Sequence, residues 1–286
     1  MAITNQTTLS NAASTRQVQN FIDGFSGSMG LGAWNKGSTF SLWGYGGLPP
    51  AGNTNPSSAI PTSLTTGALM PLVDAAAGKQ LYLGKIWARQ RYSFSGNPTP
   101  IPIRLVLRLY DRLYHASVTF TGASQTTTLN GPTVTRGPAN GIGNELWFEE
   151  DSGGFPQGSI TITYVNQSGN NATTPSFSLS PTSGDSSGGR TAQVPRMSGD
   201  SGVQSIVSIA SSGFSTYPNT RQGTVLILRE IAQYTYNFTE DEWRDALDLG
   251  LPTIDNGSCL FLMAEACVTS PQTPWGITGR IEIYQQ

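Results

Sequence analysis

Charged side chains are scarce in this chain of 286 residues, since Asp, Glu, Lys and Arg make up only 12% of it. Globular proteins contain roughly 25% of these residues. The 16 basic and 18 acidic residues nearly cancel, which leaves a formal net charge of −2. The chain therefore lacks the basic field that attracts nucleic acid, and it has no acidic tail. We expect no nucleic acid among its partners.

Residues that bind metals or carry out redox chemistry are scarce as well. The chain has one histidine, His115, and two cysteines, Cys259 and Cys267. In one continuous strand these cysteines lie about 26 Å apart, and in a helix about 12 Å apart. A disulfide needs roughly 4.4 to 6.8 Å between the two Cα atoms. We expect two free, buried thiols, no metal site and no cofactor.

Long hydrophobic runs are also missing. The segment Met1-Ala2-Ile3-Thr4 has neither the basic stretch nor the apolar core of a signal peptide. No later run approaches the roughly 18 apolar residues of a membrane span. The sequence therefore predicts synthesis in the cytoplasm and no membrane partner.

Glycine and proline are abundant, at 33 and 18 residues, and both residues favour chains of short strands joined by turns. The clearest strand is Ile103–Tyr110, where Ile103, Leu105, Leu107 and Leu109 alternate with polar or smaller residues. Further strands are predicted at 81–87, 116–121, 146–149, 160–165, 177–179, 203–209, 224–231, 259–267 and 278–284. The pattern predicts an all-β protein whose body, residues 79–286, is an antiparallel β-sandwich of the jelly-roll kind.

One short helix is expected after residue 238. Thr239 with Glu242 three residues later forms a capping box, and Gly250 followed by Pro252 would end the helix.

Residues 1–78 differ from the rest in being rich in Gly, Ser, Thr and Asn, with little periodicity. Four aromatic residues lie there: Trp34, Phe40, Trp43 and Tyr45. We interpret this segment as an extended N-terminal arm that docks on a neighbouring subunit or on its own domain, because so many aromatic rings are unlikely to remain in water. An N-terminal strand of the same domain is the alternative. If the segment is an arm, deleting it should leave a folded body.

Two arginines lie on the polar face of the predicted strand 103–110. Arg104 and Arg108 could bind carboxylates of a partner, although a solvated outer face is the more common role for such residues. With the four aromatic residues they form the predicted partner-binding set.

The segment Gly199-Asp200-Ser201-Gly202 resembles the nucleophile segment of trypsin-type proteases. Such a protease also needs a histidine as base and an aspartate that orients it. His115 lies in an unrelated context, and Val203 stands where that family has another glycine. We therefore interpret the segment as a turn and His115 as structural.

Glu145 and Glu149 are the candidates for acid/base hydrolysis of glycans. In a strand they share one face with Trp147 but lie about 13 Å apart, whereas glycosidases place their two carboxyls about 5 to 9.5 Å apart. Solvated charges at a sheet edge are the simpler interpretation, and we expect no enzymatic activity.

Six segments in this order resemble a family of virion structural proteins of tailed phages, some of which are capsid cement or decoration proteins. They are Pro61–Leu69, Leu109–His115, Tyr164–Gly169, Gly189–Ala192, Gly199–Ser205 and Leu249–Pro252. The resemblance covers roughly residues 60–286, and it implies a β-rich structural protein without catalytic residues.

The resemblance implies that the chain is a cement or decoration protein on the capsid surface of a virion, made in the bacterial cytoplasm. The expected partners are the major capsid protein and further copies of the chain, in a homotrimer. A tail, neck or fibre protein and a glycan-binding adhesin of the β-sandwich type remain the alternatives.

Overall fold

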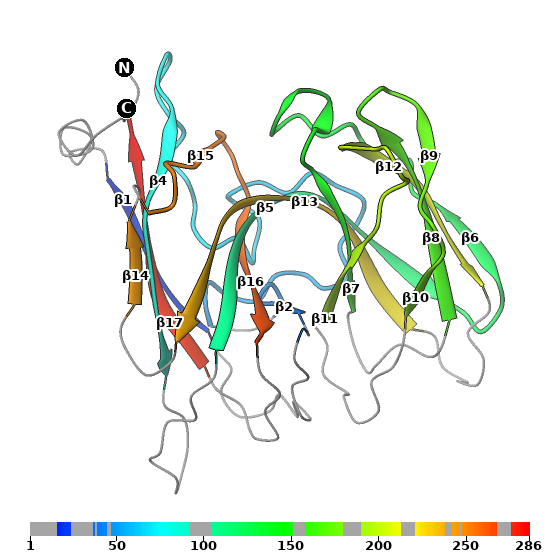
Figure 1. The fold of residues 1–286 in the computed structure, drawn as a ribbon, viewed down its shortest axis with the longest axis horizontal. Helices are drawn as coiled ribbons and strands as arrows, with labels where there is room; N and C mark the ends of the chain where they lie inside the picture. Colours follow the sequence, from blue (N-terminus) through cyan, green and yellow to red (C-terminus); the bar gives the residue numbers. More distant parts are fainter. Residues whose placement is uncertain are drawn as a thin grey trace, which may run out of the picture.

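The computed structural model describes residues 16–23, 37, 39–44, 47–91, 104–150, 158–179, 190–212, 221–237, 242–245, 248–267 and 276–286. These residues form strands β1 to β17 and one 3-10 turn, Ala139–Gly141, and all strand pairs are antiparallel (Figure 1). No α-helix occurs among them, and none of them belongs to a helix long and apolar enough to cross a membrane. The predicted all-β antiparallel class is confirmed.

The strands form three sheets, of which the middle one closes into a barrel. The barrel runs in the order β11 (Arg190–Val194), β2 (Thr39–Ser41), β16 (Leu260–Ala266), β5 (Arg104–Phe120), β13 (Arg221–Asn237) and β7 (Glu145–Glu150).

An outer sheet covers the barrel on each side. The first outer sheet contains β14 (Glu242–Asp245), β4 (Leu81–Arg91), β17 (Gly276–Gln285), β1 (Gln17–Asp23) and β3 (Gly47–Leu48), with β15 (Thr253–Ile254) beside β4. The second outer sheet contains β10 (Phe177–Leu179), β8 (Gly158–Asn166), β12 (Val203–Ser212) and β6 (Gln125–Thr128), with β9 (Asn171–Thr173) beside β8.

The long strands β5 and β13 connect the three layers. Each has 17 residues, and together they arch over the molecule (Figure 1). Their pairing is irregular between Ile227 and Leu228 and between Glu230 and Ala232, and such bulges bend a strand pair. One half of the arch packs on the first outer sheet and the other half on the second, so two sandwich cores share the same two strands.

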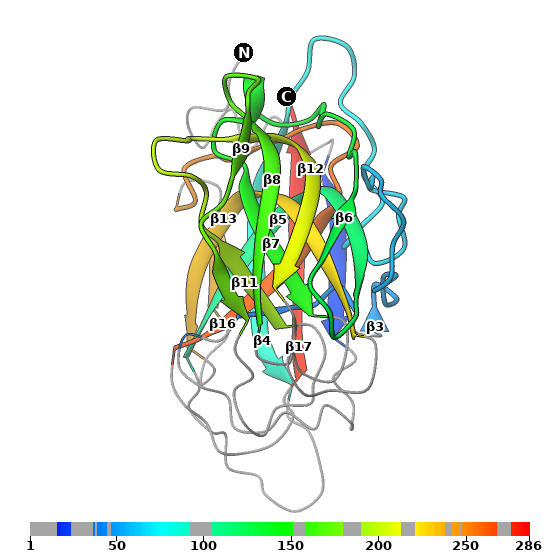
Figure 2. The same ribbon diagram turned by 90° about the vertical axis from the view of Figure 1, so that its right-hand side faces the viewer.

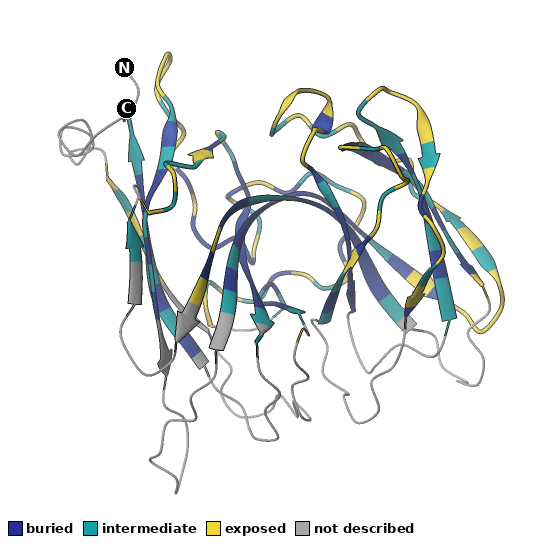
Figure 3. Cartoon of the chain, in the orientation of Figure 1, coloured by how far each residue is buried: buried dark blue, intermediate teal, exposed yellow. Residues whose placement is uncertain are grey.

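The two cores consist of the apolar faces that strand alternation predicts. In the first, Leu107 and Leu109 of β5 pack with Ile281 and Ile283 of β17. In the second, residues of the far half of β5, such as Val118, pack with those of β8 and β12. The arch is buried along most of its length (Figure 3).

The prediction of a helix after residue 238 is wrong for residues 242–245, which the structure describes. Glu242–Asp245 is strand β14, which pairs with Lys85 to Ala88 of β4. Thr239, the expected cap, lies outside the described residues. The first helical turn is costly to form, while the edge of β4 offers a ready-made row of hydrogen-bonding groups, so the tertiary pairing prevails over the local capping signal.

The described parts of residues 1–78 belong to the sheets of the body. β1 pairs with β17, and β2 lies between β11 and β16 in the barrel. Residues 49–78 run along the barrel and are bonded to it, for example through Leu69 N to Leu260 O at 2.7 Å and through a bridge between Ala59 and His115.

Candidate functional site

Aromatic and charged side chains lie together in the interior of the barrel. Apolar residues at alternate positions of β5 and β16 face the first outer sheet, so the positions between them face the interior. The aromatic and sulfur-containing residues there are Trp43, Tyr110, Trp147, Cys259, Phe261 and Met263.

Arg112 lies at the centre of this interior and is fully buried. Its Nη1 lies 2.9 Å from Oε2 of Glu149, and its Nε donates to Nδ1 of His115 at 3.2 Å. Its guanidinium carbon lies 4.3 Å from the ring centroid of Trp43 and 5.6 Å from that of Phe261. The charge is thus neutralised by one carboxylate and covered by two aromatic rings, which is a structural arrangement.

Trp43 closes one side of this interior. The indole is 1% exposed, and its Nε1 donates to the carbonyl of Asn53 at 3.0 Å. The loop approaches the indole so closely that a Cβ at Gly52 would lie 2.3 Å from its Cε2 atom. Only glycine fits at that position without displacing the ring.

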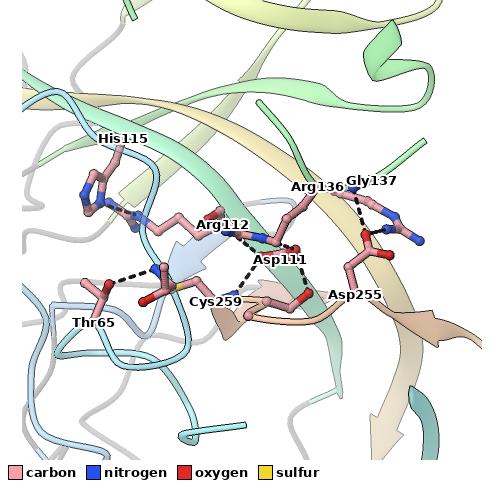
Figure 4. Close-up of polar contacts among 12 residues, drawn as sticks. Thr65, Asp111, Arg112, His115, Arg136, Gly137, Asp255 and Cys259 are labelled. Atoms are coloured by element: carbon pink, nitrogen blue, oxygen red, sulfur yellow. Dashed lines mark hydrogen bonds and ion pairs between the residues drawn. The ribbon is translucent and has the colours of Figure 1, made fainter. Parts of the chain in front are cut away.

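His115 accepts a hydrogen bond from Arg112, so Nδ1 carries no proton in the structure (Figure 4). Burial, and then the neighbouring Arg112 charge, lower the pKa of His115 to about 3. A histidine with this pKa stays neutral at physiological pH, and its partner is a cation rather than a serine.

The buried His115 should make the stability of the protein depend on pH. Because its pKa is depressed in the folded state, the unfolded chain binds more protons below about pH 6.5, and stability falls as pH decreases through that value towards 3. We expect a loss of about 2 kcal/mol between pH 7 and pH 5 from this residue.

Urea unfolding of the wild type and of His115→Gln at both pH values measures this effect. The chain has no other histidine, so the difference between the two proteins isolates this residue. An equal slope of stability against pH in both proteins would contradict the assignment.

Asp111, the residue before Arg112, is the centre of a second buried cluster of polar groups. Its carboxylate accepts hydrogen bonds from Arg136, from Oγ of Ser258 at 2.8 Å and from the backbone N of Cys259 at 2.8 Å (Figure 4). Asp255 nearby pairs with Arg229 and accepts the backbone N–H of Gly137 at 2.7 Å. These contacts fasten the loops of residues 136–137 and 255–259 to the arch.

Three carboxylates lie near Arg108. This residue belongs to the half of β5 that packs on the first outer sheet. Its two terminal nitrogens contact Glu230 at 2.9 Å and Glu265 at 2.8 Å. The hydroxyl of Tyr110 lies 3.4 Å from Glu145 and 3.3 Å from Glu230. A cavity of about 540 Å³ opens beside Arg108 and Glu265, and its lining includes Gln233, Arg244 and Asp248.

Glu145 and Glu149 are both drawn into the barrel, so the expectation of solvated edge charges is wrong for them. Glu149 is 4% exposed and binds Arg112. Glu145 accepts a hydrogen bond from Nε1 of Trp147 at 2.7 Å, and burial raises its pKa. A smaller cavity of about 260 Å³ adjoins Glu145 and Arg196. The two carboxylates contact different partners. Of the two, only Glu145 is among the described residues that line this cavity.

The loop of Asp200 and Ser201 is a fastened turn. Asp200 accepts hydrogen bonds from the hydroxyl of Tyr164 at 2.6 Å and from Nδ2 of Asn166 at 2.9 Å. Oε1 of Gln167 accepts the backbone N–H groups of Ser201 and Gly202. The carboxylate therefore binds a tyrosine and an amide, and the histidine of a protease triad is bound elsewhere, to Arg112.

Both cysteines are free thiols. Cys259 is buried, Cys267 is half-buried, and neither forms a disulfide. Burial raises the pKa of the Cys259 thiol to about 12. Among the described residues no group of His, Cys, Asp and Glu side chains has the arrangement of a metal site.

The structure describes the side chains of three of the six predicted partner-binding residues. Phe40 and Trp43 are buried in the cores of the chain itself, and Arg108 is paired with two carboxylates of the same chain. Phe40 and Trp43 thus fill the interior of the chain, while Arg108 is ion-paired beside the larger cavity. Trp34, Tyr45 and the side chain of Arg104 lie outside the described residues.

Comparisons with known proteins give little more. No family model matches the chain, and no curated protein matches it. Among solved structures, infectious bursal disease virus of the Gx strain aligns with 8% identity over 94% of this chain and 78% of that one, at a TM-score of 0.23. The VP2 subviral particle of the same virus aligns with 12% identity over 94% and 80%, at a TM-score of 0.20. This is a weak likeness to viral capsid structures.

Proposed function

We propose that the chain is a structural protein of a tailed-phage virion, and that it acts as a cement or decoration protein on the capsid lattice. Binding to the assembled shell in preference to free subunits would stabilise the shell by mass action. The proposed partners are the major capsid protein and further copies of the chain in a homotrimer.

The observation that supports this proposal best is the structural role of the segments that resemble the phage family. The segment Leu109–His115 supplies Asp111 and Arg112, which hold the barrel and its loops together. In Leu249–Pro252, the carbonyl of Pro252 accepts the backbone N–H of Leu83 and so fastens the chain to β4.

Two other segments of the resemblance bind each other. Tyr164–Gly169 and Gly199–Ser205 are joined through Asp200 and through Gln204, whose side chain donates to the carbonyl of Asn166 at 2.8 Å. These four segments thus maintain the scaffold, as expected of a protein whose work is packing rather than catalysis.

Copy number in the particle tests the proposal. Quantitative mass spectrometry of purified virions should find the chain in numbers comparable to the capsid protein, because a cement protein occupies a site that the lattice repeats. A few copies per particle would indicate a tail, neck or fibre component. Absence from purified virions would refute a structural role in the particle.

A further inference from the structure

The outer face of the second outer sheet consists mainly of side chains that carry a hydroxyl group. Residues directly opposite each other in antiparallel strands share a face, and Ile160, Ile162 and Ile209 point into the core. The residues between them therefore point outwards, on the face that Figure 2 shows. They are Thr126, Thr128, Ser159, Thr161, Thr163, Thr173, Ser178, Ser208, Ala210 and Ser212. We call this set the hydroxyl face.

The hydroxyl face is ordered in rows across the sheet. One row runs from Thr173 through Thr163 and Ser208 to Thr128. Neighbouring hydroxyls bond within the face, as Thr163 and Thr173 do at 3.2 Å between Oγ1 atoms. Its residues are exposed or half-buried, and all but Ala210 carry a hydroxyl. Val165 and Asn171 follow on the same face beyond Thr163 and Thr173, and they carry no hydroxyl.

No described residue of the hydroxyl face is charged, which is unusual for a sheet surface in contact with water. The outer face of the first outer sheet shows the usual pattern, with Arg280 paired to Glu282 at 2.9 Å and Lys85 opposite Glu282. Charges on an exposed sheet keep it soluble and prevent association. Depletion of charge is instead a property of the centre of an interface.

We propose that the hydroxyl face binds the same face of a second copy of this chain. A hydroxyl both donates and accepts hydrogen bonds, so a surface of hydroxyls is complementary to itself, and two copies meet without like-charge repulsion. A contact of one patch with itself is the geometry of a two-fold interface. The hydroxyl face also has no aromatic residue on which a sugar ring would stack.

The size of the hydroxyl face indicates a weak contact. Four strands about 4.8 Å apart and about six residues long cover roughly 400 Å² on each copy. The roughly 800 Å² buried in total is less than the about 1,200 Å² at which stable specific interfaces begin, so the association is expected to be weak and transient. The inference does not depend on the proposed virion function, since the face is a property of the isolated chain.

Sedimentation equilibrium of the full chain, from micromolar to about 1 mM, tests the inference. The weight-average mass of the wild type should rise towards twice its value at the lowest concentration. Thr163→Arg, on the hydroxyl face, places two positive charges in the contact and should weaken the association at least about tenfold. Thr253→Arg is the matched control, because Thr253 is an exposed threonine of β15 at the other end of the molecule.

The outcomes separate clearly. A rise in mass that Thr163→Arg removes and Thr253→Arg retains supports the inference, provided that both variants unfold at the temperature of the wild type. If Thr163→Arg loses its fold, Ser208→Arg on the same row replaces it. A constant mass of the wild type up to 1 mM, or equal association of all three proteins, overturns the inference, and neither result affects the copy-number test.

Discussion

A chain that begins at residue 79 is expected not to fold. Its deletion would remove β2, which lies between β11 and β16 and so closes the barrel. It would also remove β1 from the first outer sheet and Trp43 from the barrel interior. The exposed edges of β11 and β16 would then be open to pairing with other chains.

Expression of residues 79–286 beside the full chain measures this effect. We expect an insoluble fragment, or one without a cooperative thermal transition. A soluble fragment that unfolds cooperatively would show that residues 1–78 are a dispensable arm, as their composition suggested.

A point substitution in the same segment refines the test. Trp43→Ala should destabilise the full chain by about 3–5 kcal/mol, because the indole is buried and its loss leaves a cavity. Leu64→Ala is the control, since Leu64 is 80% exposed, and such a surface change is expected to stay within about 0.5 kcal/mol. Denaturant unfolding of the three proteins gives both values.

The limits of the sequence are clearest in strand β5. Alternation of apolar residues predicts its first half up to Tyr110, and a separate strand is predicted from residue 116. The structure joins the two into one strand from Arg104 to Phe120. Asp111, Arg112 and His115 interrupt the apolar pattern, but their partners lie on other strands and loops, such as Glu149 of β7 and Cys259 before β16. Local periodicity contains no information about such distant partners.

The same reason explains the residues whose positions were left open or predicted wrongly. For Trp43 the sequence leaves open whether it docks on a neighbouring subunit or on its own domain, because its glycine-rich surroundings show little periodicity. Its environment is formed by Phe261, Arg112 and His115, which follow it by 69 to 218 positions in the chain. Glu145 and Glu149 alternate with Trp147 as predicted, and only barrel closure decides that this face points inwards. Elements formed from local pattern were predictable, and their pairing in a closed barrel was not.

Removing the carboxylate of Glu149 should have the second large effect. Glu149→Ala would leave Arg112 buried without its counter-ion, and loss of one partner of a buried ion pair costs about 3–5 kcal/mol. The aromatic rings of Trp43 and Phe261 would compensate only in part, because a cation–π contact contributes about 2 kcal/mol when desolvated.

An ion pair in which the arginine is half-exposed and the carboxylate has a second arginine partner, Arg280, serves as the control. Arg16 lies 3.6 Å from Glu282, and its side chain is 45% exposed. Arg16→Ala should therefore cost less than about 1 kcal/mol. Chemical denaturation at pH 7 compares the two variants, and equal costs would contradict the assignment of Arg112 as a buried charge that depends on Glu149.

The double variant Arg112→Met with Glu149→Leu separates the two possible roles of the pair. If the pair only fills space, apolar residues of similar volume should restore most of the stability that Glu149→Ala loses, because they need no counter-ion. If the pair also fixes the position of Trp43 and His115, the double variant should be stable but less uniquely packed, with weaker near-ultraviolet circular dichroism from Trp43. We expect the second result, since Arg112 contacts His115 as well as Glu149 and lies directly against the indole of Trp43.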